Sequence, residues 1–129
     1  MLTALGASAG AQEIAEPLTA VPGDAARGKA VAVNSDMGNC LICHDVTIPE
    51  LTPGSSGDIG PSLDGVGSRL SEGELRQRIV DPRVIAPDTL MPAYHSTEGF
   101  TRVDPRYAGK PILDAQEVED LIAFLLTLK

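Results

Sequence analysis

The pentapeptide Cys40-Leu41-Ile42-Cys43-His44 holds the residues with the most distinctive chemistry in the chain. Two thiols at this spacing reach both vinyl groups of a haem, and the adjacent imidazole is then placed to bind the iron. The chain of 129 residues contains no cysteine beyond these 2. The spacing therefore predicts one covalently attached haem c, joined to Cys40 and Cys43, with His44 as an iron ligand.

Two other kinds of site also use paired cysteines. A thioredoxin-like redox pair follows a strand of a parallel sheet, and no alternating run in this sequence is long enough to predict a strand. A zinc site needs about four ligands, whereas His95 is the sole further His or Cys. Both alternatives fit the sequence less well than haem does.

An iron held by His44 needs a second axial ligand from elsewhere in the chain. The candidates are Met91, Met37 and His95, and Met37 lies too close in sequence to the cysteines to cross to the opposite face. Met91 lies 47 residues after His44 (91 − 44), and Pro92 stiffens the segment that presents it. A thioether raises the reduction potential, as an electron carrier requires. We expect Met91 to bind the iron and His95 to lie in a loop or at the haem periphery, although Met91 as ordinary core filler stays open.

The tetrapeptide Gly60-Pro61-Ser62-Leu63 is a candidate for the surroundings of the imidazole. We expect the Pro61 carbonyl to accept a hydrogen bond from the other ring nitrogen of His44, which would fix the orientation and basicity of the ring. Leu63 is expected to pack on the haem edge. A Gly-Pro turn also occurs without any such role.

Three helices are predicted to position these residues. Asp24 can cap a helix over residues 25–33. Ser71 and Glu74 have capping-box spacing and open a short helix that stops at Asp81-Pro82. Asp114 caps the last helix, whose apolar residues follow helical spacing: Val118, Leu121, Ile122, Leu125 and Leu128.

The segments between these helices are too rich in Gly and Pro for regular structure, above all residues 45–67 and the stretch from Pro82 to Pro111. Loops of this length are uncommon in a compact domain unless they are functional, and a large prosthetic group between them would explain them. Gly28 and Phe124 suggest a close crossing of the first and last helices, with the Phe124 ring lying where the glycine lacks a side chain, although ordinary packing explains both residues equally well. The fold class predicted is all-α, with short helices and long loops wrapped around one haem.

Length and charge bound the function further. A chain of 129 residues is enough for one domain. With 10 Lys and Arg against 18 Asp and Glu, the net charge of −8 argues against nucleic acid and fits a partner with a basic or mixed face. No apolar stretch approaches the roughly 18 residues of a membrane span.

The first residues predict export. Residues 1–11 are small and apolar and end in a signal-peptidase-like Ala-Gly-Ala before Gln12, which is typical of an export signal, although a flexible Ala-rich terminus has the same composition. We therefore interpret residues 1–11 as the remnant of such a signal, residues 12–23 as an N-terminal extension and residues 24–129 as the haem domain.

These motifs resemble a known family. The Cys40-x-x-Cys43-His44, Gly60-Pro61-x-Leu63 and Met91-Pro92 motifs, with an apolar C-terminal helix, resemble the class I monohaem cytochromes c over residues 24–129. The longer stretches 38–40, 60–67, 88–94, 109–113 and 117–120 resemble the SoxX family, the small cytochrome subunits of the SoxAX complexes of sulfur-oxidising bacteria.

The resemblance implies His44 and Met91 as iron ligands and a periplasmic heterodimer with a larger SoxA-type subunit carrying one or two haems. It further implies an L-cysteine S-thiosulfotransferase, which joins thiosulfate oxidatively to a cysteine of a SoxYZ-type carrier protein at the partner's sulfur-ligated haem. The present chain would accept the electrons and pass them to a soluble cytochrome. It has no third cysteine, so the sulfur-ligated catalytic site cannot lie in it, and no catalytic residue is expected here.

Two other functions stay open on the sequence. One is a free-standing electron carrier, for which the same haem and Met91 would serve. The other is a haem sensor or peroxidase-like protein, in which the position of Met91 opens to a small ligand.

Overall fold

The computed structural model describes residues 12–129, and all regular structure in that range is helical. The four α-helices are α1 (Ala25–Val33), α2 (Val66–Arg69), α3 (Glu72–Val80) and α4 (Ala115–Leu126). Three short 3-10 helices lie in the connections, η1 (Cys40–Ile42), η2 (Pro82–Val84) and η3 (Pro105–Tyr107). The predicted all-α class, with short helices and long loops, is confirmed.

The three predicted helices form where their capping residues indicate. The Asp24 side chain accepts a hydrogen bond from the Arg27 N–H at the start of α1. Ser71 and Glu74 form a reciprocal capping box at α3, and Asp114 accepts from the N–H of Glu117 at α4. Leu128 lies beyond α4, which ends at Leu126.

The helix α2 is a feature that the sequence does not predict. It begins at Val66, within the segment 45–67 expected to be loop, and it follows Gly65 in the left-handed conformation at φ 77°. Its single turn buries Val66 and leads directly into α3.

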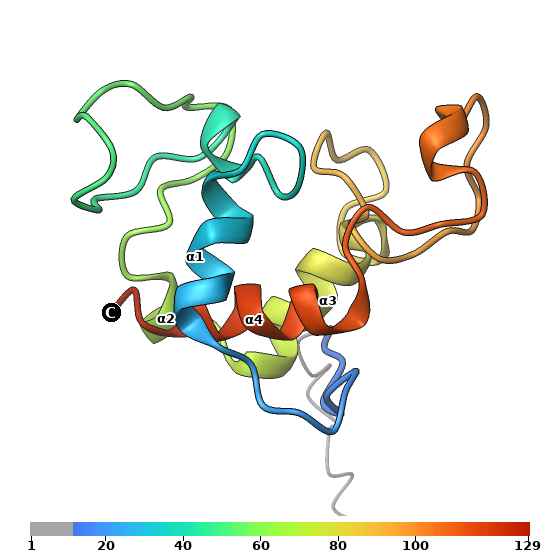
Figure 1. Cartoon of the computed structure of the whole chain (residues 1–129), viewed down its shortest axis with the longest axis horizontal. Coiled ribbons are helices and arrows are strands. Elements are labelled where there is room, and N and C mark those ends of the chain that lie inside the picture. The colour runs from blue at the N-terminus through green and yellow to red at the C-terminus, as the bar shows by residue number, and fades with distance from the viewer. Residues whose placement is uncertain (1–11) are drawn as a thin grey trace, which may run out of the picture.

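The helices α1 and α4 cross with their backbones in contact. A Cβ atom placed on Gly28 would overlap the backbone carbonyl of Asp120, so no larger residue fits there. The predicted close crossing is confirmed, but the placement of the Phe124 ring beside Gly28 is wrong. The atoms nearest to an added Cβ belong to the backbone of Asp120 and Leu121, because the two helices approach too closely to leave room for a ring. Figure 1 shows α4 lying across the foot of α1, with α3 beside it and the long loops extending from the opposite side of this scaffold.

The core lies where these helices meet. Every residue of α4 is buried or half-buried, and Val118, Leu121 and Ile122 are almost completely buried. They pack with Leu75 and Ile79 of α3. Within residues 12–129, no helix combines the length and the apolar character that crossing a membrane requires.

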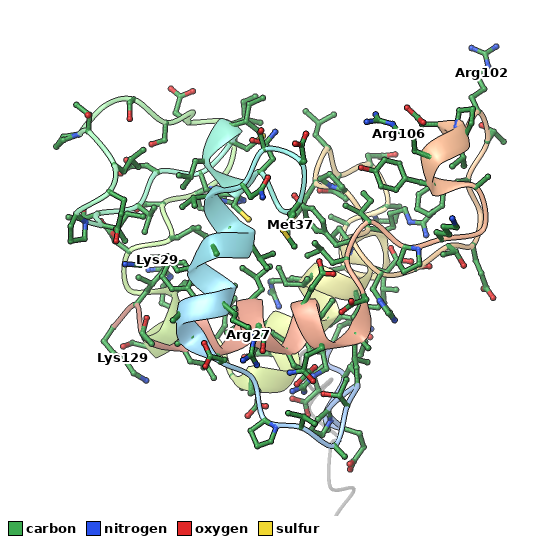
Figure 2. All side chains as sticks on the ribbon, in the orientation of Figure 1. Arg27, Lys29, Met37, Arg102, Arg106 and Lys129 are labelled. Atoms are coloured by element: carbon green, nitrogen blue, oxygen red, sulfur yellow. The ribbon has the colours of Figure 1, made fainter. Side chains whose placement is uncertain are left out.

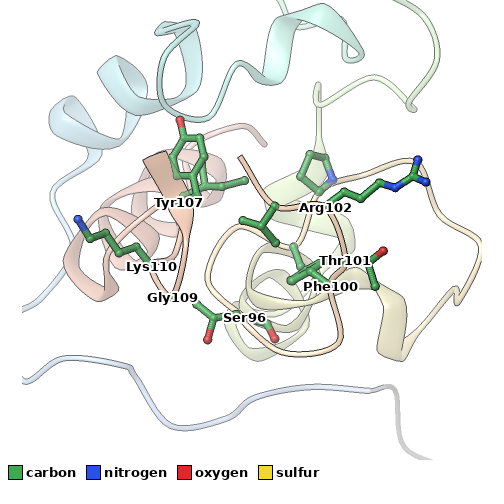
Figure 3. A pocket seen from close by; sticks show the side chains of 12 residues that line it. Ser96, Phe100, Thr101, Arg102, Tyr107, Gly109 and Lys110 are labelled. Atoms are coloured by element: carbon green, nitrogen blue, oxygen red, sulfur yellow. The ribbon is translucent and has the colours of Figure 1, made fainter. Parts of the chain in front are cut away.

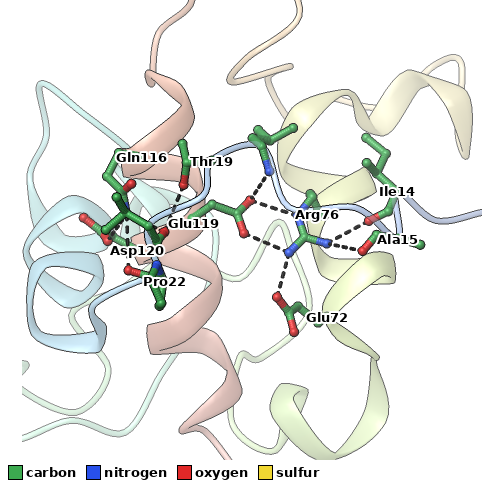
Figure 4. Close-up of polar contacts among 11 residues, drawn as sticks. Ile14, Ala15, Thr19, Pro22, Glu72, Arg76, Gln116, Glu119 and Asp120 are labelled. Atoms are coloured by element: carbon green, nitrogen blue, oxygen red, sulfur yellow. Dashed lines mark hydrogen bonds and ion pairs between the residues drawn. The ribbon is translucent and has the colours of Figure 1, made fainter.

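A buried ion pair joins α3 to α4. The Arg76 guanidinium is completely buried and makes two bonds of 2.8 Å to the Glu119 carboxylate, from Nε and Nη2. Its Nη1 donates to the carbonyl of Ile14 at 2.8 Å, and Nη2 also reaches Glu72. Figure 4 shows this guanidinium between the N-terminal extension and both helices. One side chain therefore fixes three segments to each other.

We expect Arg76→Ala to destabilise the protein by about 3–5 kcal/mol, because it leaves the buried Glu119 carboxylate without its partner. Arg106→Ala is the matched control, since Arg106 pairs with Asp104 while 75% of its side chain is exposed, and it should cost about 1 kcal/mol or less. The measurement is urea unfolding of the haem-loaded protein, followed by circular dichroism. Equal free energies of unfolding for the two variants would show that the buried pair stabilises the protein no more than the exposed pair does.

Candidate functional site

The two cysteines lie on one turn directly after α1. The chain leaves α1 at Asn34, passes through Asn39 in the left-handed conformation, and forms η1 with Cys40 as its first residue. The backbone N–H groups of Cys43 and His44 both donate to the Cys40 carbonyl, at 3.2 and 2.9 Å. The turn therefore holds both thiols and the imidazole on a short, fixed piece of backbone.

The environment of Cys40 does not resemble a redox-active thiol pair. Burial raises the pKa of the Cys40 thiol to about 11, whereas thioredoxin-like sites lower the pKa of the attacking thiol. Cys40 packs at the edge of the hydrophobic core. The described residues also contain no group of three or more His, Cys, Asp or Glu side chains suited to a metal ion, so the zinc interpretation has no support from them.

The His44 imidazole is fixed by the neighbouring loop as the sequence predicts. Its Nδ1 lies 2.6 Å from the Pro61 carbonyl oxygen. Because a carbonyl only accepts, Nδ1 carries the proton and Nε2 keeps its lone pair for a metal. The ring is half-buried. The expected hydrogen bond is confirmed, while the bond from Nε2 to iron stays a prediction.

Gly60 forms one wall of the imidazole site, a role that the sequence analysis missed. A Cβ atom on Gly60 would lie within 2.6 Å of Nδ1 and 2.8 Å of Nε2 of His44. The Gly60 N–H also donates to the Cys43 carbonyl at 2.7 Å. The ring therefore rests directly on the Gly60 backbone, and a glycine immediately before the proline that accepts from a histidine is the signal that could have indicated it.

Leu63 and Met91 lie on different loops around the same core. Leu63 is buried, and its N–H donates to the Asp45 carbonyl at 2.8 Å. Met91 is half-buried, packs against the core cluster, and donates its N–H to the Thr89 hydroxyl at 3.1 Å. Met37 is half-buried against the same cluster. Packing of Leu63 on a haem edge and ligation by Met91 stay predictions.

Tyr94 joins the loop that carries Met91, here called the Met91 loop, to the loop that carries Cys40. Its buried hydroxyl donates to the Gly38 carbonyl at 2.5 Å, two residues before Cys40. Its backbone N–H donates to the carbonyl of Ile79, near the end of α3, at 3.0 Å. The sequence analysis missed this link, although a tyrosine three residues after a candidate ligand, in a chain with few aromatic residues, is a usable signal.

His95 is engaged outside the site. Its Nδ1 lies 2.9 Å from the Leu113 carbonyl oxygen, and its backbone N–H donates to Val80. This position agrees with the expected role in a loop. The side chain would have to give up the Leu113 carbonyl before it could approach the position of Met91.

The residues present fit a covalently bound haem. The thiols and the imidazole are held on one turn, and Nε2 of the imidazole is free. Gly60 leaves the ring the space that a side chain would otherwise fill. A thioether is available on a second loop that Tyr94 fastens to the first. In c-type haem sites the two cysteine thiols attach the macrocycle, and the imidazole binds the haem iron.

Comparison with known proteins gives the class. The cytochrome c family model matches residues 25–129, and the chain belongs to the cytochrome c family. Membership implies covalently bound haem c, and it confirms the predicted cytochrome c-like fold.

Two individual proteins extend this result. A chain in the crystal structure of SoxXA from P. pantotrophus is 36% identical, with a TM-score of 0.80, over 92% of this chain and 90% of that one. A cytochrome c-553-like protein of Synechocystis sp. is 30% identical over 109 residues, which are 84% of this chain and 73% of the relative. The likeness to SoxXA confirms the predicted SoxX resemblance.

We expect Gly60→Ala to push the His44 ring away from the Pro61 carbonyl and to change the iron coordination. Gly54→Ala is the control in the same loop, because Gly54 has φ 80° and no neighbour within 4 Å of an added Cβ. The control should lower the free energy of unfolding only through backbone strain, by about 1 kcal/mol. The visible absorption spectrum of the purified haem protein is the readout. An unchanged spectrum in Gly60→Ala would contradict the role of Gly60.

Proposed function

We propose that this chain is the electron-transfer haem subunit of a SoxAX-type L-cysteine S-thiosulfotransferase. The observation that carries the proposal is the likeness to a chain of SoxXA over nearly the full length of both chains, at 36% identity.

In this proposal a single haem c, bound through Cys40 and Cys43, supplies one-electron redox chemistry. His44 is the proximal iron ligand, and Pro61 holds its ring in the tautomer that leaves Nε2 free. Met91 is the second iron ligand. Leu63 contributes an apolar wall, which keeps water from this side of the site.

The chain itself contributes no catalytic acid, base or nucleophile. Oxidative joining of thiosulfate to a carrier cysteine forms a sulfur–sulfur bond and releases electrons. We assign the joining step to the sulfur-ligated haem of a SoxA-type partner, with one or two haems, because the 2 cysteines of this chain are both committed to haem attachment. The present subunit takes up the electrons and passes them on.

The remaining partners and the location follow from the same proposal. The substrate is carried by a SoxYZ-type protein, and the electrons leave to a soluble cytochrome. The complex works in the periplasm after export. Residues 1–11, interpreted as a remnant of the export signal, lie outside the described residues, while residues 12–23 form the extension and residues 24–129 the haem domain.

We expect Met91→Ala to abolish the sulfur-to-iron charge-transfer absorption of the ferric protein and to lower its reduction potential, because a thioether favours ferrous iron. Met37→Ala, which removes the other half-buried thioether, should leave both properties unchanged. If the absorption survives in Met91→Ala, Met91 is not the ligand. Rapid carbon monoxide binding to the reduced wild-type protein would favour a sensor or peroxidase-like function instead.

We expect a larger haem protein to remain with this chain during mild purification from the native periplasm. The haem of the pair should become reduced when thiosulfate and the carrier protein are added together, and thiosulfate alone should leave it oxidised. Absorption spectroscopy follows the reduction. A cytochrome that emerges alone, with a sulfur-ligated haem, would be a free-standing electron carrier and would refute the proposed complex.

A further inference from the structure

Residues 99–112 form a separate projection beside the Met91 loop, here called the basic lobe. Figure 1 shows it standing away from the helical scaffold, with η3 near its tip. Its base is fixed by Arg83, whose guanidinium stacks 4.1 Å from the centre of the Phe100 ring and donates to the Glu98 carbonyl at 2.9 Å. The lobe is thus anchored at its base, while its outer part faces solvent.

A pocket with a volume of about 300 Å³ lies between the basic lobe and the Met91 loop. Figure 3 shows the side chains that line it. The lobe supplies Val103 and Tyr107, and the Met91 loop supplies Pro92 and Ala93. Val103 is 44% exposed. The pocket is therefore an open, mainly apolar recess that is large enough to admit a large side chain.

Two cations stand on opposite sides of this pocket. Figure 3 shows the side chains of Arg102 and Lys110 extending away from its centre in opposite directions. Among the described residues, neither takes part in an ion pair, whereas the neighbouring Arg106 pairs with Asp104 at 3.0 Å. Free positive charge at the pocket rim is available to an incoming partner.

The charge of the lobe is opposite to that of the cysteine and histidine loops. The lobe holds three basic residues and one acidic residue, in a chain with a net charge of −8. In contrast, residues 30–68 contain no Lys or Arg and five acidic residues, namely Asp36, Asp45, Glu50, Asp58 and Asp64, of which Glu50 pairs with Lys29 at 2.8 Å. The two faces therefore select partners of opposite charge.

We infer that the basic lobe is the docking surface for the larger haem subunit, which inserts an apolar side chain flanked by carboxylates into the pocket. This inference rests on the proposed function. Pro92 and Ala93 directly follow Met91, so a partner seated in the pocket lies beside the haem site, where electron transfer from the partner requires it. The acidic face over residues 30–68 then remains for a basic electron acceptor.

The test measures binding of the haem-loaded chain to the larger haem subunit by calorimetry at low and high salt. The double variant Arg102→Glu/Lys110→Glu should bind roughly tenfold more weakly or worse, with less dependence on salt. The control is Lys29→Glu/Lys129→Glu, which changes the net charge equally. Figure 2 shows Lys29 and Lys129 far from Arg102, and the control should bind like the wild type.

A second variant tests the pocket without changing the charge. Val103→Ser removes apolar surface from an exposed position and should weaken binding several-fold, with the wild-type salt dependence retained. An unchanged haem spectrum and melting temperature verify that each variant is folded. A variant that does not fold is replaced by Arg102→Gln/Lys110→Gln or Val103→Thr, for which the same direction of change is expected.

The outcomes separate the two proposals. If the wild-type chain binds the larger subunit and the lobe variants bind equally well, the docking inference is wrong and the proposed function stands. If the wild type does not bind that subunit at all, both are wrong. If the wild type self-associates in sedimentation and the lobe variants do not, the occupant is a second copy of this chain, which also overturns the inference.

Discussion

The contact between Gly28 and the carbonyl of Asp120 is the constraint on which the rest of the molecule depends. It lets α1 and α4 touch along their backbones. The Asp120 carboxylate strengthens the same crossing, because it accepts from the Asp24 N–H at 2.8 Å and from Arg27 Nε at 2.9 Å. Burial alone would raise the pKa of Asp120, but hydrogen bonds from Arg27, the Asp24 N–H and Gln116 together hold it below its usual value.

The residues of the site lie on irregular loops that extend from this crossing. Their geometry is therefore set by hydrogen bonds from side chains to backbone carbonyl groups. His44 uses Pro61, Tyr94 uses Gly38, and His95 uses Leu113. The three bonds join residues that are 17, 56 and 18 positions apart in the sequence. Gly38 and Leu113 are buried, and a buried carbonyl requires a donor, which Tyr94 and His95 supply. The contacts that order the loops are therefore the same contacts that orient the side chains of the site.

Local signals explain what the sequence predicts well. The caps at Asp24, Ser71 and Asp114 act within three residues of themselves, so the three helices could be placed before the structure was known. The residues predicted to bind haem could be identified because the chemistry of covalent attachment fixes their spacing. The hydrogen bond from His44 to Pro61 was also predictable, since it serves the chemistry of the same motif.

Contacts between distant segments explain what the sequence does not predict. Arg76 resembles an ordinary surface residue paired with Glu72 one turn away, and only the fold shows that it is buried against Glu119. The hydrogen bond from the Tyr94 hydroxyl to the Gly38 carbonyl joins residues that are 56 positions apart. The pocket at the basic lobe depends on how two loops lie in space. Arg76 and the pocket have no periodic or local signature, and the one signal for Tyr94 is its position three residues after Met91.

The crossing of α1 and α4 has a further consequence for how this molecule can change over evolutionary time. It pins residue 28 to residue 120, so the segment between them is a chain with both ends fixed. Lengthening one of its exposed irregular stretches costs little, about 0.6 kcal/mol for each doubling of a flexible loop. Insertions between the helices are therefore tolerated while the scaffold keeps its stability. A projection such as residues 99–112 can be gained, lost or resized, and one haem scaffold can acquire new specificities without being rebuilt.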